Sequence, residues 1–141
     1  MRSRPFLVIA GVASLAAVPV AQASRAPTKS ERAAIKKDVQ RAAGKTARFE
    51  TIRISSKDKR FAYVKDTEGR GPGAPRAKVT QILIRPGAQY GDTVRQKFPG
   101  WVRVVYQDGF APTTCGDYLE RAPVSVLREF KIKDATSGAA C

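Results

Sequence analysis

Cys115 and Cys141 are the two cysteines of a 141-residue chain that contains no histidine. A thiol becomes a strong nucleophile when a neighbouring base removes its proton, and this chain has no imidazole to act as that base. The lack of histidine also removes Ser-His catalytic pairs and imidazole-bound zinc sites. The alternative role for Cys115, as a nucleophile, has no Cys-x-x-Cys pair to support it. In an oxidising compartment the two residues would pair, so we predict a Cys115–Cys141 disulfide.

Paired carboxylates could supply acid–base chemistry without histidine. Asp117 and Glu120 would lie together at i and i+3 if this stretch is helical. Acids at that spacing are far more often solvated residues near a helix end, and nothing in the sequence indicates the burial that would raise one pKa. We therefore assign no catalytic residue, metal ligand or cofactor, and expect a protein that is not an enzyme.

Positive charge is the strongest compositional signal, with 26 Lys and Arg against 12 Asp and Glu and a formal net charge of +14. Such a surface attracts polyanions. Basic residues are interleaved with Phe61 and Tyr63, and aromatic rings beside cations can stack bases. In the alternative interpretation the rings belong to the core and the cations to a solvated face. The candidate polyanion contacts are Lys57, Lys59, Arg60 and Lys65.

The first residues have the composition of a secretory signal peptide. Arg2 and Arg4 precede an apolar run over residues 6–18, and Ala21-Gln22-Ala23 supplies small side chains before a cleavage site. The run is shorter than the ~20 residues that a membrane-spanning helix needs. We predict a signal peptide at residues 1–23 and a single secreted domain at residues 24–141, without a later transmembrane segment.

A helix is expected directly after this segment. Thr28-Lys29-Ser30-Glu31 has the spacing of a capping box, in which the first and last side chains bond each other's backbone amides. Ile35 and Val39 follow on one face, with basic residues on the other, and Gly44 provides an end. Further along, Pro123 fits the first turn of a second, short helix.

Short runs of β-branched and aromatic residues predict four strands, over residues 47–54, 61–64, 78–85 and 101–107. The alternation slips after Phe49, so we expect a bulge or a later start in the first strand. Residues 66–77, rich in Gly and Pro, are expected to form an exposed loop. The predicted fold is α+β, with the N-terminal and short C-terminal helices on one face of a roughly four-stranded antiparallel sheet.

The expected core draws on every predicted element. Trp101 begins a β-branched strand, so it is expected to be a buried anchor rather than an exposed ligand platform. The remaining core positions are Ile35, Val39, Ile52, Ile54, Val64, Ile82, Ile84, Leu127, and Val102 and Val104 or their alternating partners.

Several short motifs extend over most of the chain after the signal peptide. They are Ser30-Glu31-Arg32-Ala33-Ala34-Ile35, Arg53-Ile54-Ser55, Tyr63-Val64, Gly100-Trp101-Val102-Arg103-Val104-Val105, Cys115 and Pro123-Val124. This combination resembles small secreted proteins of high-GC actinobacteria that have no assigned function. The resemblance implies a compact secreted domain and carries over no catalytic or binding residue.

Three hypotheses of function follow from these observations. The first is a small secreted, non-catalytic domain that binds a protein or has a structural role at the cell envelope. The second is an electrostatic binder of anionic polymers, either an envelope glycopolymer or nucleic acid. The third is a small secreted hydrolase or inhibitor. Sequence-specific recognition of nucleic acid is not expected, because no motif that reads bases is present.

Overall fold

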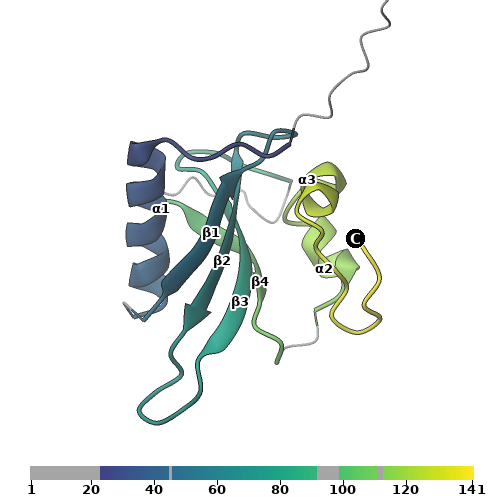
Figure 1. The fold of residues 1–141 in the computed structure, drawn as a ribbon. Helices are drawn as coiled ribbons and strands as arrows, with labels where there is room; N and C mark the ends of the chain where they lie inside the picture. Colours follow the sequence, from purple (N-terminus) through teal and green to yellow (C-terminus); the bar gives the residue numbers. More distant parts are fainter. Residues whose placement is uncertain (1–22, 45, 92–98, 111–112) are drawn as a thin grey trace, which may run out of the picture.

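The computed structural model describes residues 23–44, 46–91, 99–110 and 113–141, so all but the last residue of the predicted signal peptide lies outside it. A four-stranded antiparallel sheet with the order β1-β2-β3-β4 forms its centre (Figure 1). This confirms the predicted α+β class. The elements are α1 (Lys29–Ala42), β1 (Arg48–Ile54), β2 (Phe61–Glu68), β3 (Ala77–Ile84), β4 (Val102–Gln107), α2 (Cys115–Leu119) and α3 (Val124–Glu129). Among the described residues, no helix is both long enough and apolar enough to cross a membrane.

The helix α1 begins at the predicted capping box. The Thr28 hydroxyl accepts the Glu31 amide at 3.2 Å, and the Glu31 carboxylate accepts the Thr28 amide at 2.8 Å. Both bonds satisfy amides that a helix start leaves without partners. Gly44 follows the helix with φ +62°, a conformation that favours glycine.

The helices lie on opposite faces of the sheet, so their predicted placement on one face is wrong. Figure 1 shows α1 on one side and the pair α2 and α3 on the other. Leu83 packs in a cluster with Ile35 of α1, whereas Ile82 packs in a separate cluster with Leu127 of α3. Successive side chains of a strand point to opposite faces of the sheet. Because helices cover both faces, the adjacent residues Ile82 and Leu83 of β3 are both buried.

The predicted core is largely confirmed. All of the predicted core positions are buried except Val102, which is partly exposed while its neighbours Val104 and Val105 are buried. Trp101 has an exposed fraction of 8%. Phe61 is fully buried, which removes it as a platform for stacking bases. It belongs to the core, as the alternative interpretation of the basic region proposed.

The strands agree with the prediction in β1 but differ from it at the loop between β2 and β3. In β1 the register shifts between Phe49 and Thr51, as expected for a bulge. The strand β2 continues to Glu68, so the predicted loop at 66–77 is wrong at both ends and spans only residues 69–76. Asp66 and Glu68 pair with residues of β3, and side chains of β3 and β4 bond their carboxyl groups. The short helix α2 was not predicted as a separate element.

The predicted disulfide is present. Cys115, the first residue of α2, is bonded to Cys141, with their Cα atoms 5.4 Å apart. The Cys141 amide also donates to the carbonyl of Ile132 at 2.9 Å. The C-terminal segment is therefore attached to the α2 and α3 side of the sheet through both a covalent bond and the backbone.

Candidate functional site

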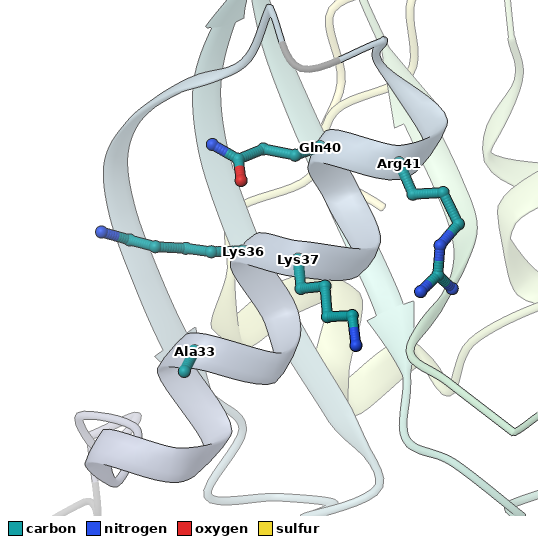
Figure 2. Close-up of a pocket in the computed structure, with 5 residues that line it drawn as sticks. All are labelled: Ala33, Lys36, Lys37, Gln40 and Arg41. Carbon is teal, nitrogen blue, oxygen red and sulfur yellow. The ribbon is translucent and has the colours of Figure 1, made fainter.

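The solvent-facing side of α1 carries most of the positive charge of this helix. Helical geometry places Lys37 and Arg41 opposite the buried Ile35 and Val39, whereas Arg32, three residues before Ile35, is exposed in the first turn. Figure 2 shows Lys36 extending to one side of the helix and Lys37 and Arg41 to the other. Together with Ala33 and Gln40 they line a surface hollow of about 590 Å³. We define the α1 surface as Lys29, Arg32, Lys36, Lys37 and Arg41.

The two carboxylates of α1 neutralise little of this charge. Glu31 receives two bonds from Arg25, at 2.7 and 2.8 Å, in addition to its capping bond. The Arg25 guanidinium lowers the pKa of Glu31 to about 2. Asp38 accepts the Trp101 amide at 2.9 Å and lies 3.3 Å from Arg41. Within the described part of the chain, Arg41 is therefore the one member of the α1 surface that forms an ion pair.

Other carboxylates are likewise occupied by structural contacts. Glu129 of α3 accepts the amide and hydroxyl of Ser56, at 2.9 and 2.7 Å, and the hydroxyl of Ser55. Although burial alone would raise the pKa of Glu129, these bonds bring it below its usual value. Asp134 accepts the hydroxyl and amide of Thr136 and the amide of Cys115, and these hydrogen bonds lower its pKa. The acids stabilise turns and helix ends, and the surplus of cations remains on the surface.

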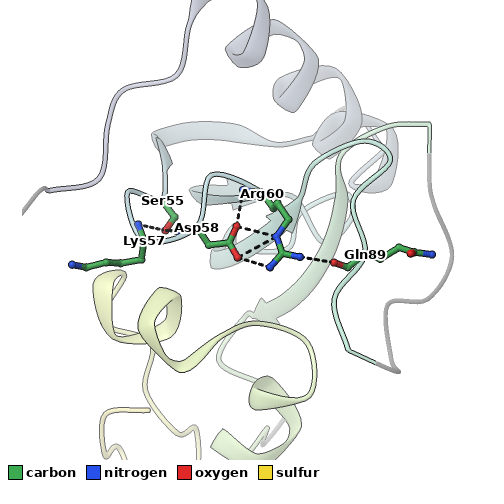
Figure 3. A network of polar contacts seen from close by, with 5 residues as sticks. All are labelled: Ser55, Lys57, Asp58, Arg60 and Gln89. Atoms are coloured by element: carbon green, nitrogen blue, oxygen red, sulfur yellow. Dashed lines mark hydrogen bonds and ion pairs between the residues drawn. The ribbon is translucent and has the colours of Figure 1, made fainter.

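Arg60, one of the predicted polyanion contacts, is held in a polar network at the turn between β1 and β2. Figure 3 shows its guanidinium against Asp58 and beside the Gln89 carbonyl. The guanidinium nitrogens donate to both Asp58 oxygens, with a shortest distance of 2.6 Å, and to the Gln89 carbonyl at 2.8 Å. The bond and charge of Asp58 raise the pKa of Arg60. This cation supports the turn, and most of its donors are already used.

The other three predicted contacts occupy different surroundings. Lys65 lies on β2 with its ammonium 3.4 Å from the Glu50 carboxylate. Lys57 and Lys59 are exposed in the turn. Lys59 lines a hollow together with Ala34, so the structure brings this residue close to α1. The four cations are therefore split between ion-paired and exposed positions.

The carboxylate pair considered for acid–base chemistry has a structural role. Asp117 forms a capping box at the start of α2, where it accepts the Thr114 amide at 3.1 Å. It is exposed, and the bonds from Thr114 lower its pKa. Glu120 is exposed at the end of the same helix. Neither residue is buried, so the structure gives no sign of an acid–base couple here.

A buried carboxyl pair that the sequence analysis missed lies on the α1 side of β2. Asp66 is fully buried and Glu68 has an exposed fraction of 8%. The Gln81 amide donates to both, at 2.8 Å to Asp66 and 3.3 Å to Glu68, and the Tyr106 hydroxyl donates to Glu68 at 3.0 Å. Acids two residues apart in a strand share one face, which is the signal that could have revealed the pair.

Asp66 of this pair holds a proton more readily than an exposed carboxyl does. Burial, with a smaller contribution from Glu68, raises the pKa of Asp66 to about 6, although Gln81 and Arg103 favour its charged form. The Asp66 carboxyl cannot touch a substrate because it is enclosed by the sheet and the residues above it. The described residues also contain no group of three potential metal ligands.

Comparison with known proteins gives no assignment: no family model matches the chain, and neither a curated protein nor a solved structure matches it. The distribution of charge over the fold is therefore the basis for a function.

Proposed function

We propose that the protein is a non-catalytic domain that binds anionic polymers electrostatically through the α1 surface. The observation that carries the proposal is that α1 has five cations, of which only Arg41 forms an ion pair with a described residue, while Glu31 is engaged by Arg25 and Thr28. An ordered helix presents these charges on a fixed frame. Polymers rich in phosphate or carboxylate are the partners that such a surface attracts.

Two further features support this function over binding to a protein. Exposed large apolar side chains, which form the centre of most protein interfaces, are few in the described residues: Phe110, Leu119 and Val124. Phe110 is moreover covered on one side by Arg70, whose guanidinium carbon lies 3.7 Å from the ring centroid. The predicted secretion would bring the protein into contact with envelope glycopolymers, and the disulfide is consistent with an oxidising compartment.

The test compares two variants of equal net charge. The first, K29Q/R32Q/K36Q/K37Q, removes four charges from the α1 surface. The control, K78Q/R121Q/R128Q/K133Q, removes four exposed charges outside α1. Binding to heparin and to single-stranded DNA is measured by fluorescence anisotropy at physiological ionic strength.

We expect the α1 variant to bind at least about 10-fold more weakly than the wild type, because several anion contacts are lost together. The control should change by less than about 3-fold, because its charges lie outside the contact. Equal weakening of both variants would show that net charge, rather than the α1 surface, determines binding. Unchanged binding by the α1 variant would reject the proposal.

A further inference from the structure

Two hollows lie beside α1, and both are lined by Trp101. The first, of about 270 Å³, lies next to Ser30 and Ala34. The second, of about 390 Å³, lies next to Asp38 and Arg41. Helix positions that recur at intervals of three or four share one side, so both hollows follow the same flank of the helix.

Trp101 joins the two hollows and fixes the helix at the same place. It packs with Ile35 and Val39 in the core on the α1 side, and its amide donates to Asp38. From Ser30 to Arg41 the helix rises by about 16 Å at 1.5 Å per residue. We call the two hollows together, from Ser30 to Arg41, the flank groove.

Cations are placed at both ends of the flank groove. Lys59 and Arg85 line the first hollow, and Arg41 and Arg103 line the second. The Arg103 guanidinium carbon lies 4.3 Å from the Tyr106 ring centroid, a stacked position that orients the side chain without using its donors in an ion pair. Arg85 also forms no ion pair with a described residue.

The carboxylates in the groove offset only part of these charges. Glu31 lines the first hollow but is bonded by Arg25 and Thr28. Asp38 lines the second hollow, where it accepts the Trp101 amide and also lies 3.3 Å from Arg41, so it offsets one cation in part. Three of the four cations at the ends are arginines, whose planar donors match the oxygens of phosphate.

We propose that the flank groove holds a single linear chain bearing phosphate groups, with its charges held by Lys59 and Arg85 at one end and by Arg41 and Arg103 at the other. This inference rests on the proposed function, and it extends the contact from Arg41 of the α1 surface to the neighbouring flank of the helix. A single chain can follow the side of one helix and meet both ends. A duplex carries its phosphates on two backbones across a groove of about 12 Å, which does not match two cation pairs set along one side of a helix.

The test uses the full chain and short inorganic polyphosphate, a linear phosphate chain without bases or sugars. The variant R85Q/R103Q removes one arginine from each end of the groove. The matched control K78Q/R128Q removes two exposed charges that lie outside both α1 and the groove. A second groove variant, K59Q/R85Q, leaves the Arg103–Tyr106 contact intact, and thermal melting checks that every variant is folded.

We expect both groove variants to bind short polyphosphate at least about 10-fold more weakly than the wild type, and the control to lose less than about 3-fold. The variant R85K/R103K should recover only part of the loss, because lysine keeps the charge without the planar donors. Binding of duplex DNA should change by a similar small factor in the groove variants and the control.

Wild-type binding of polyphosphate by the folded groove variants would overturn the inference, as would equal losses in the groove variants and the control. A loss of duplex binding as large as the loss of polyphosphate binding would overturn the restriction to a single chain. These results differ from failure of the proposed function, which would appear as heparin binding that does not depend on the α1 surface.

Discussion

Asp66 shows how one buried carboxyl can determine the pH dependence of stability. Its folded-state pKa, about 6, lies above the ordinary value of 3.8, so the folded protein binds the proton more tightly than the unfolded chain. The resulting stabilisation is complete below about pH 4 and is lost as the pH rises through about 6. A shift of this size corresponds to about 3 kcal/mol at most.

Replacing Asp66 with Asn tests this effect, because an amide stays neutral and can donate to Glu68. We expect D66N to raise the free energy of unfolding at pH 8 by about 1–3 kcal/mol and to flatten its fall between pH 4 and pH 7. Urea denaturation across this range measures both quantities. Glu50→Gln, which changes an exposed acid, should leave the pH profile unaltered. A D66N profile as steep as that of the wild type would contradict the assignment.

Trp101 is predicted to contribute more to stability than any surface residue near it. Only 8% of this residue is exposed, and it packs against the apolar face of α1. Trp101→Ala should lower the free energy of unfolding by about 3–5 kcal/mol, measured by urea denaturation. Trp101→Phe, which keeps much of the volume, should lose less. A loss below about 1 kcal/mol in the Ala variant would show that the ring is not an anchor.

At the scale of elements, the disulfide connects α2 to the C-terminus across a sequence separation of 26 residues. Closing such a loop restricts the unfolded chain by about 3.5 kcal/mol in the loop-entropy treatment. The double variant C115S/C141S should therefore unfold at a lower urea concentration. Hydrogen exchange should show the largest loss of protection near Cys141, whose amide is bonded to Ile132. Unchanged stability, together with unchanged exchange, would contradict this role.

The features of the fold that could be predicted from the sequence depend on residues close together in the chain. The start of α1 could be predicted because Thr28 and Glu31 bond within one turn, and the bulge after Phe49 appeared as a slip in alternation. The faces that the helices cover could not be derived from such local patterns. The adjacent apolar residues Ile82 and Leu83 were the available signal that both faces of the sheet are buried.

The candidate site was harder to predict than the fold for a physical reason. A sequence gives the number of cations but not which of them are neutralised, and ion pairs join residues from different elements. Lys65 was a reasonable candidate until the pairing of β1 with β2 placed Glu50 beside it. The basic residues of α1 could be assigned to the wet face from helix periodicity, but their importance depends on where the carboxylates bind.

At the scale of the whole molecule, the net charge of +14 raises the question of whether any polyanion binding is local. Ionic strength can separate the two cases. The Debye length is about 30 Å at 10 mM salt and about 8 Å at physiological salt. Charges far from a bound polymer therefore contribute at low salt and are screened at high salt.

We predict that the two four-charge variants, K29Q/R32Q/K36Q/K37Q and K78Q/R121Q/R128Q/K133Q, weaken heparin binding to a similar extent at about 10 mM salt and diverge as salt increases. At about 150 mM salt the control should approach the wild type, while the α1 variant should remain weaker. In a plot of log affinity against log salt concentration for single-stranded DNA, each lost contact reduces the slope by about 0.7. The α1 variant should therefore have a shallower slope by up to about 3, and the control should keep the slope of the wild type. Parallel slopes for all three proteins would mean that no single face makes the contacts, and the α1 surface would then be one part of a diffuse positive field.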